Sequence, residues 1–327
     1  MSICVFSGEM QQVLEQVRRL HANRAIPVLI EGETGTGKDA VARYIHCGDE
    51  HIDEPFIELS CALIAPESTE ADLFGYAPGA CGGALPRGKK GKIDLAQGGT
   101  LFLDHVEALS PAVQPKLLRM IEDKAFYRVG GLKKVKADFR IICASSVDLA
   151  GQVERGSFRP DLYYRLSVAR IYLPPLRERR EEIIPLARMF LARFAREKGK
   201  RFAGISRRAA DLLRSYYWPG NIRELRNTIE LIVALWDDEE VTPAHLAMLP
   251  KARMLSETPG FSGTNVINPG DFSLPLGSLP LEEYNNRIIL KALEMHGGNK
   301  TKTAKYLGIS RRSLDCRLKR IKSAVFP

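Results

Sequence analysis

The segment Gly32-Glu33-Thr34-Gly35-Thr36-Gly37-Lys38 determines the fold class of this chain. It follows the apolar run Pro27–Glu31 and precedes a helical pattern that starts near Asp39. A strand, a glycine-rich loop and a helix in this order form a phosphate-binding loop, in which backbone N–H groups and the helix dipole face the phosphate. We expect residues 32–39 to bind nucleotide, with Lys38 on the terminal phosphates. Asp39 occupies the place where the general motif has Ser or Thr for Mg²⁺.

A second element lies downstream, Gly98-Gly99-Thr100-Leu101-Phe102-Leu103-Asp104. An apolar strand that ends in a carboxylate is the expected magnesium partner of a phosphate-binding loop. Taken alone, the segment would be a buried strand that ends at a surface aspartate. Its position downstream of the loop favours Asp104 as the residue that positions Mg²⁺.

Residues 8–173 alternate helical patterns with short apolar strands, which predicts an α/β domain with a parallel sheet covered on both faces. The predicted strands are Pro27–Glu31, Pro55–Leu59, Thr100–Asp104 and Phe139–Ala144. The pattern then becomes helical, over Glu181–Lys198, Ser206–Tyr216 and Asn221–Trp236. Residues 255–279 are rich in Ser, Pro, Gly and Asn, which is typical of a linker. The predicted domains are residues 1–173, 174–250 and 280–327, with a linker at 251–279.

The composition fits a soluble globular protein, with 45% hydrophobic and 27% charged residues in a chain of 327. It excludes wholesale disorder, a collagen and a disulfide-stapled miniprotein. The sequence contains no run of about 18 apolar residues, so no membrane span is predicted. The six cysteines form no CxxC or Cys/His cluster. We therefore expect free thiols in the reducing cytoplasm, and neither a zinc site nor a membrane partner.

Positive charge is concentrated at the C-terminal end. The last 47 residues carry eleven Lys and Arg against four Asp and Glu, whereas the net charge of the whole chain is +9. A basic terminal module on a nearly neutral body suggests an anionic partner, most often nucleic acid. The alternative at this point is a solvated cationic tail.

The basic segment contains a helix-turn-helix pattern. A short helix over Asn299–Leu307 precedes a turn at Gly308-Ile309, and Ser310 caps a second helix that extends from Arg311 to Arg320. The outward side chains of the second helix are expected to meet a major groove of double-stranded DNA, and they are Arg311, Arg312, Ser313 and Arg317. Phosphate contacts are expected from Lys300, Lys302 and Lys319. The alternative is a basic helical hairpin that serves only for dimerisation.

Read in order, the chain resembles the bacterial sigma-54-dependent transcription activators of the AAA+ family. The matching segments are GETGTGKD, DLFGYAPGA, GGTLFLD, KLLRMIEDKAFYRVGG, FRPDLYYRLSVARIYLPPLRERREEI, YYWPGNIRELRN and GGNKTKTAKYLGISRRSL. The resemblance implies a three-layer AAA+ P-loop domain, an all-α lid and a Fis-type helix-turn-helix domain. It also implies ATP and Mg²⁺, sigma-54 RNA polymerase as a partner, and a ring, usually hexameric, of one chain or of two paralogues. An N-terminal sensory domain is expected to be absent.

The resemblance also assigns roles to single residues. Lys38 would bind phosphate, Asp104 would position Mg²⁺, and Arg223 in WPGNIREL would be the lid arginine that senses the γ-phosphate. Arg159 and Arg165 in FRPDLYYRL would act in trans on the ATP of a neighbouring subunit. A guanidinium suits these roles because it is always charged and can hold two phosphate oxygens. The alternative for each arginine is an ordinary surface ion pair.

Four positions depart from the family pattern. His105 replaces the glutamate that polarises the attacking water, Ser60 replaces the asparagine that switches this glutamate, and Ser146 replaces the sensor asparagine. The loop that contacts sigma-54 has the sequence Gly79-Ala80-Cys81-Gly82-Gly83-Ala84 in place of GAFTGA. If the strand continued past Asp104, Glu107 would share the face of His105 and could compensate in part.

Three hypotheses follow. The chain is a full activator that hydrolyses ATP, or a DNA-binding and ATP-binding regulator with impaired hydrolysis and sigma-54 contact, or an AAA+ machine independent of DNA. The basic terminal module disfavours the third. The changes at Cys81-Gly82 and His105 favour the second, in which the protein is a repressor, a co-regulator or a subunit of a mixed ring.

Overall fold

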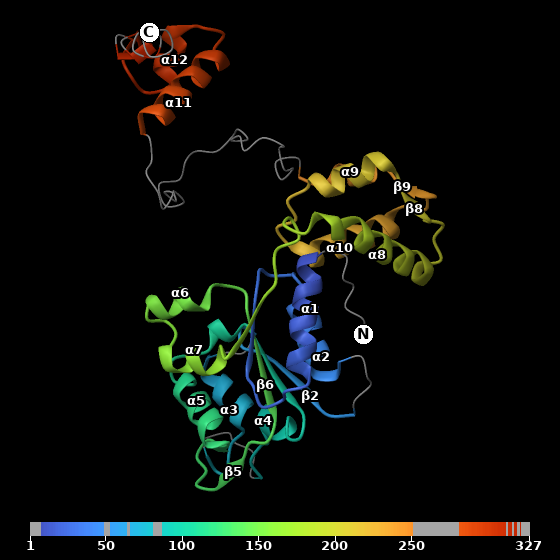
Figure 1. The fold of residues 1–327 in the computed structure, drawn as a ribbon, viewed down its shortest axis with the longest axis vertical. Helices are drawn as coiled ribbons and strands as arrows, with labels where there is room; N and C mark the ends of the chain where they lie inside the picture. The colour runs from blue at the N-terminus through green and yellow to red at the C-terminus, as the bar shows by residue number, and fades with distance from the viewer. Residues whose placement is uncertain are drawn as a thin grey trace. The chain divides into compact units, whose positions relative to one another are not determined.

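The computed structural model describes residues 8–48, 53–63, 66–80, 87–250, 281–311, 313–315, 317, 318 and 321. They belong to two compact units, which divide at residue 260 (Figure 1). The predicted linker at 251–279 lies outside the described residues. Within the described part of the chain, every helix is too short or too polar to cross a lipid bilayer.

The first unit is built on a five-stranded parallel sheet in the order β2-β3-β6-β1-β7. Its strands are β1 (Val28–Glu31), β2 (Phe56–Ser60), β3 (Thr100–Asp104), β6 (Arg140–Ser145) and β7 (Ala169–Tyr172). The parallel α/β fold is confirmed, and each of the four predicted strands matches its observed bounds within one residue. The register pairs Leu29 with Cys143 and Leu101 with Ile141.

Helices cover both faces of this sheet (Figure 1). One face packs Val28, Ile30 and their neighbours against α1 (Gly8–His21) and α2 (Lys38–Cys47). The other face packs Leu29 and its neighbours against five helices. They are α3 (Pro66–Phe74), α4 (Lys92–Leu95), α5 (Gln114–Asp123), α6 (Leu149–Glu154) and α7 (Pro160–Leu166). Successive strand residues point to opposite faces, so the continuous apolar runs read in the sequence give a sheet buried on both sides.

An antiparallel hairpin follows α5. It consists of β4 (Ala125–Tyr127) and β5 (Lys134–Lys136), with Phe126 paired to Val135. These three-residue strands were not predicted, because they are too short to show an alternating pattern.

The helical lid follows the sheet and has its own core, formed by residues between Leu176 and Leu249 with Tyr216 and Trp218 fully buried. Its helices are α8 (Ile183–Lys198), α9 (Arg207–Ser215) and α10 (Asn221–Leu235), with short turns η2 (Arg180–Glu182) and η3 (His245–Met248). One feature differs from the all-helical prediction. Two-residue strands, β8 (Gly204–Ile205) and β9 (Glu240–Val241), pair in parallel, and a pair of this length leaves no periodic signal in a sequence.

The second unit contains α11 (Leu281–Met295), α12 (Lys300–Tyr306) and a third helix, in which residues 311, 313–315, 317, 318 and 321 are helical. Its core joins Ile289, Ala304 and Leu314, with Leu318 and Ile321. The Ser310 hydroxyl accepts a hydrogen bond from the backbone N–H of Ser313 at 3.1 Å. This is the N-cap that the sequence predicts, and the helix-turn-helix fold is confirmed.

Candidate functional site

The loop between β1 and α2 depends on glycine at two positions. Gly35 and Gly37 have φ angles of 82° and 102°, which L side chains rarely adopt. A Cβ atom on Gly35 would also lie 2.3 Å from the carbonyl oxygen of Gly220, at the start of the lid helix α10. The loop can therefore form only with a bare backbone at this point.

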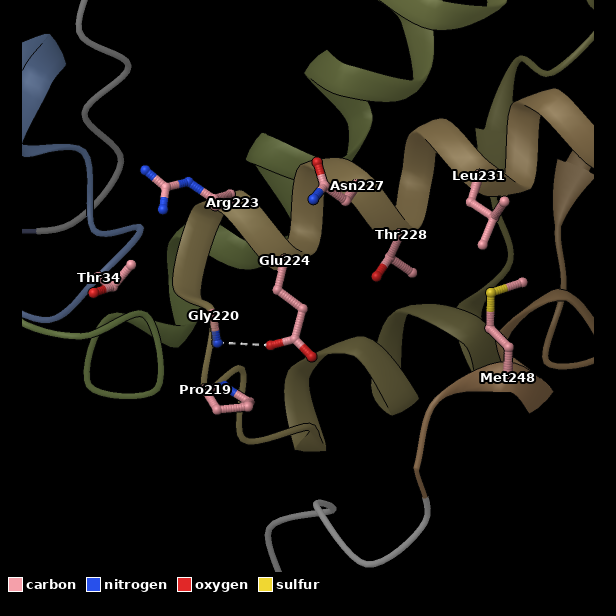
Figure 2. Close-up of a pocket in the computed structure, with 9 residues that line it drawn as sticks. All are labelled: Thr34, Pro219, Gly220, Arg223, Glu224, Asn227, Thr228, Leu231 and Met248. Atoms are coloured by element: carbon pink, nitrogen blue, oxygen red, sulfur yellow. Dashed lines mark hydrogen bonds between the residues drawn. The ribbon is translucent and has the colours of Figure 1, made fainter. Parts of the chain in front are cut away.

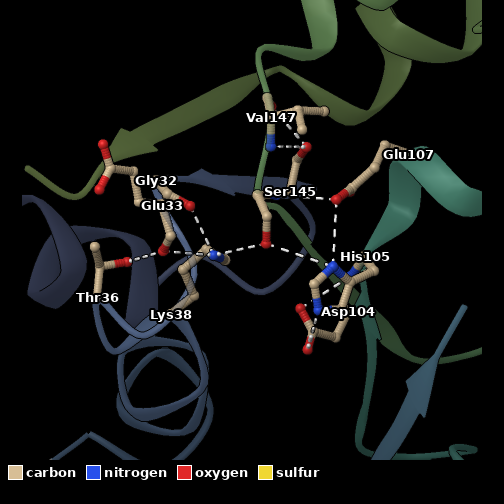
Figure 3. Close-up of polar contacts among 10 residues, drawn as sticks. Gly32, Glu33, Thr36, Lys38, Asp104, His105, Glu107, Ser145 and Val147 are labelled. Carbon is tan, nitrogen blue, oxygen red and sulfur yellow. Dashed lines mark hydrogen bonds and ion pairs between the residues drawn. The ribbon is translucent and has the colours of Figure 1, made fainter. Parts of the chain in front are cut away.

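Lys38 begins α2 and is buried. Its ammonium group donates hydrogen bonds to the carbonyl oxygens of Gly32 at 2.7 Å and Glu33 at 3.0 Å (Figure 3). It also donates to the hydroxyl of Ser146 at 3.1 Å. Burial lowers the pKa of Lys38, while the nearby carboxylates of Asp104 and Glu107 act in the opposite direction. The Lys38 ammonium group is thus held by hydrogen-bond acceptors that the oxygens of a bound anion can replace.

The chain turns sharply after Asp104. Strand β3 ends there, His105 has a left-handed backbone (φ 54°, ψ 49°), and the turn η1 (Val106–Ala108) follows. The strand does not continue, so strand alternation is not what brings Glu107 beside His105. The turn does so instead, and leaves Nδ1 of His105 3.3 Å from Oε1 of Glu107 (Figure 3).

Ser146 connects this pair to Lys38. Its backbone N–H donates to Oε1 of Glu107 at 3.1 Å, and its hydroxyl lies 3.4 Å from Nδ1 of His105. Oε2 of Glu107 is buried and has no hydrogen-bond partner among the described residues. A buried acceptor of this kind is costly unless a water molecule or a ligand satisfies it.

Residues of the helical lid form hydrogen bonds to the phosphate-binding loop (P-loop). The backbone N–H of Ile222 donates to the carbonyl of Gly35 at 2.9 Å. The side-chain amide of Asn221 donates to Glu33 at 3.1 Å and to the carbonyl of Thr34 at 3.0 Å. Asn221 is fully buried, with a φ of 51°. Asn221 was not predicted as a site residue, although a polar residue inside the apolar pattern of the lid is a signal that marks it.

Two arginines before α8 add to this contact. Arg177 forms a two-point ion pair with Glu33, at 2.6 and 2.8 Å. This guanidinium is the main reason why the pKa of Glu33 is lowered. The buried Arg179 donates to the carbonyl of Thr36 at 2.8 Å and pairs with Glu182 at 3.1 Å. Neither arginine was predicted as a site residue, because a run of charges in a sequence is usually a solvated surface.

Arg223 is exposed on α10, and its side chain points toward Thr34 of the P-loop (Figure 2). A cavity of about 540 Å³ opens beside these two residues. Its lining consists of Thr34, Pro219, Gly220, Arg223, Glu224, Asn227, Thr228, Leu231 and Met248. The structure therefore brings the predicted lid arginine to the P-loop, next to an open space.

The other two predicted arginines lie apart from this cluster. Arg159 precedes α7 and is bound to Asp161 at 2.7 and 3.0 Å, while Arg165 is exposed in the last turn of the helix. Among the described residues, neither contacts the P-loop of its own chain.

The predicted sigma-54 loop is described only in part. Gly79 and Ala80 are described, and Cys81, Gly82, Gly83 and Ala84 lie outside the described residues. Just before the loop, the backbone N–H of Ala77 donates to the carbonyl of Val129 at 2.9 Å. Ser60, at the end of β2, is paired in register with Asp104.

In the second unit, the predicted DNA-contacting side chains are mostly at the surface. Lys300, Lys302, Arg311 and Arg317 are exposed and Ser313 is half-buried, whereas Arg312 and Lys319 lie outside the described residues. Lys300 forms an ion pair with Asp315 at 2.8 Å.

Metal ligation in the first unit depends on few groups. In the part of the chain that is described, no three His, Cys, Asp or Glu side chains gather as a cation site. Asp104 and Glu107 are the carboxylates near Lys38, and Mg²⁺ in nucleotide sites is usually held by one or two carboxylates together with the phosphates.

The fold and this cluster define the class of protein. A P-loop follows β1, a carboxylate ends β3, and β6 lies between them, while a helical lid holds the loop. This is the arrangement of an AAA+ nucleotide-binding domain. Three family models match the chain: the sigma-54 interaction domain at residues 3–172, the AAA+ ATPase lid domain at 177–259, and the bacterial regulatory protein, Fis family, at 280–320.

The chain belongs to the sigma-54 interaction domain family. It is 43% identical over 293 residues to the transcriptional regulatory protein ZraR of Klebsiella oxytoca, covering 90% of this chain and 63% of the relative. It is 41% identical over 318 residues to ZraR of Escherichia coli K12, covering 96% and 67%. NtrX from Brucella abortus in complex with ADP has 32% identity and a TM-score of 0.69, covering 98% and 70%. The chain thus spans about two thirds of the length of these relatives.

The ion pair between Glu33 and Arg177 should make the stability of the protein depend on pH. The pKa of Glu33 is lowered in the folded state, so the pair stabilises the protein above the ordinary glutamate pKa of 4.5 and the stabilisation is lost as the pH falls through the folded-state pKa. In Arg177→Gln, we expect the pKa of Glu33 to rise, as measured by carboxyl ¹³C NMR. The difference in unfolding free energy between Arg177→Gln and the unmodified protein should shrink as the pH falls from 6 to 3. Arg180→Gln is the control, and an equal response to both changes would contradict the assignment.

Proposed function

We propose that this chain is an ATP-binding, sequence-specific DNA-binding transcriptional regulator of the sigma-54 activator family in which ATP hydrolysis and sigma-54 contact are impaired. It would act as a co-regulator, as a subunit of a mixed ring or as a repressor. The observation that carries the proposal is the cluster around Lys38. It retains the cation and carboxylate that hold a nucleotide, but places the imidazole of His105 where the family has a carboxylate.

The residues present fit ATP with Mg²⁺. Lys38 would exchange its carbonyl acceptors for phosphate oxygens, and the N–H groups of residues 33–38 would line the same phosphates. Asp104 would hold Mg²⁺, and Arg223 would approach from the lid. When bound, the nucleotide supplies the phosphoanhydride bond to be hydrolysed. The ADP complex of the related NtrX supports this assignment.

Impaired hydrolysis is supported by the geometry after β3. A water molecule that attacks phosphate needs an acceptor to orient it, and in the family this acceptor is the carboxylate replaced here by His105. The His105 ring is engaged by Glu107 and lies near Ser146, so it is not free to take the role of a mobile carboxylate.

A second candidate function is a fully competent activator. One observation favours it, because Glu107 supplies a carboxylate within the same cluster, with a buried oxygen that lacks a partner in the described structure.

Weakened sigma-54 contact is supported by sequence alone, since Cys81 and Gly82 replace the aromatic and threonine residues of the family loop.

Ring assembly is proposed from the two arginines of FRPDLYYRL. Arg159 and Arg165 are exposed on or next to α7, where a neighbouring subunit could receive them. Arg159 would exchange Asp161 for the phosphates of that neighbour. A hexamer of this chain, or of this chain with a paralogue, follows from the family resemblance.

The nucleotide assignment predicts the behaviour of Lys38→Ala. Loss of the buried ammonium removes a charge-assisted contact to phosphate, so ATP affinity should fall by about 10²-fold or more. Titration with a fluorescent ATP analogue measures the change, and Lys116→Ala on the exposed side of α5 is the control. Equal affinity in the two variants would remove Lys38 from the site.

The hydrolysis assignment predicts a gain of function. His105→Glu restores a carboxylate, so steady-state ATP turnover should rise by about 10²-fold, within the range of a positioned general base. Glu107→Gln should lower the residual turnover of the unmodified protein if Glu107 compensates. ATP affinity should stay within about threefold in both variants. High turnover of the unmodified protein, with no gain in His105→Glu, would instead support the competent activator.

The DNA assignment predicts two kinds of effect in the full chain. Lys302→Ala should reduce the slope of log affinity against log salt by about 0.9, because one phosphate contact is lost, and it should do so on all sequences. Arg311→Ala should weaken the preferred site by about 1–3 kcal/mol relative to random DNA if it contacts a base edge. Sites selected from a random library and fluorescence anisotropy provide the measurement. Identical effects of the two variants on both kinds of DNA would contradict these roles.

A further inference from the structure

A strong concentration of positive charge lies in the first unit, away from Lys38. The segments 87–92 and 124–136 carry nine Lys and Arg and no Asp or Glu. Residues 1–280 contain 37 basic and 35 acidic side chains, so the remainder of this part has 28 basic against 35 acidic. The two segments are therefore basic, whereas the rest of residues 1–280 carries a net negative charge.

The two segments form the walls of one groove, which has a volume of about 410 Å³. Arg87, Lys89 and Lys90 line it from the first segment, and Arg128 and Lys133 line it from the second. The backbone of Tyr76 holds both walls together. It exchanges hydrogen bonds with Lys89 at 3.0 Å in each direction, and it forms a bridge to Val129.

Most of this charge is not neutralised within the protein. Three ion pairs account for three of the cations, and they are Lys89–Asp72 at 3.0 Å, Arg128–Asp94 at 2.7 Å and Lys136–Asp138 at 2.8 Å. The other six have no ion pair among the described residues, and they are Arg87, Lys90, Lys92, Lys124, Lys133 and Lys134. All except the half-buried Lys92 are exposed.

We propose that this groove, called here the basic groove, binds the phosphate backbone of a nucleic acid. Positive walls on two sides focus the field into the space between them. Seven of the nine cations in the two segments are lysines, and Lys89, Lys90 and Lys133 are the lysines that line the groove. Lysine is depleted in protein–protein interfaces, whereas its compact charge neutralises phosphates well. The basic groove would be a second contact, separate from the helix-turn-helix unit.

An acidic protein is the competing ligand. Leu132, in the turn between β4 and β5, is 97% exposed and would suit an apolar contact with a protein. A single exposed leucine among unpaired lysines is a small apolar anchor, so the charge pattern favours phosphate. The test must nevertheless separate the two ligands.

The experiment compares three full-length proteins that share an unchanged helix-turn-helix unit. They are the unmodified protein, Arg87→Gln/Lys90→Gln/Lys133→Gln in the basic groove, and Arg196→Gln/Lys198→Gln/Lys200→Gln at the end of α8. Both triple variants remove the same charge from the same unit. Their binding to a fluorescent 40-base-pair duplex of random sequence is titrated between 50 and 200 mM KCl. Matching thermal unfolding curves confirm that the substitutions leave the fold intact.

We expect the groove variant to lose about two to three units from the slope of log affinity against log salt, and the α8 variant to lose less than about one. Formaldehyde cross-linking of the duplex to the unmodified protein, which captures lysine amines close to DNA, should label peptides that contain residues 87–92 or 124–136. Equal slopes in the two variants, or no cross-link in these peptides, would overturn the proposal. So would a groove variant that loses binding to poly-glutamate while keeping its affinity for the duplex, since the ligand would then be an acidic protein.

Discussion

The site depends on the burial of one ammonium group. Lys38 is buried and needs hydrogen-bond acceptors, and they lie where the parallel strands β1 and β6 end at the same edge of the sheet. The strand order decides which acceptors these are. Strand β6 lies between β1 and β3, so Ser146, just past its end, falls between Lys38 on one side and the Asp104–Glu107 turn on the other. A change at Ser146 therefore reaches both the cation and the carboxylates.

The parts of the fold that could be predicted are those with a regular apolar pattern or a characteristic residue motif. Buried strands appear as apolar runs, and their predicted bounds are correct within one residue. The β4–β5 hairpin and the β8–β9 strand pair could not be predicted, because strands of two or three residues are too short to show a periodic pattern. The positions of Lys38 in the loop and of Asp104 at the end of β3 could also be predicted, since a glycine-rich loop and a strand that ends in a carboxylate leave few alternative structures.

The contacts that could not be predicted are those set by tertiary structure. Nothing in the sequence indicates that His105 adopts a left-handed backbone, and this single turn decides where Glu107 lies. Asn221 and Arg177 reach the P-loop from more than a hundred residues away in the chain. Their partners depend on how the lid packs against the sheet domain, which no local pattern encodes.

The near contact between Gly35 and Gly220 has a mechanical consequence. The loop and the first turn of α10 meet backbone to backbone, with no side chain between them to act as a cushion. Stiff, short contacts transmit displacement, whereas long side chains absorb it by changing rotamer. A shift of the loop by a fraction of an ångström must therefore move the end of the lid helix with it. The position of the first turn of α10 is thus directly coupled to the conformation of the phosphate-binding loop.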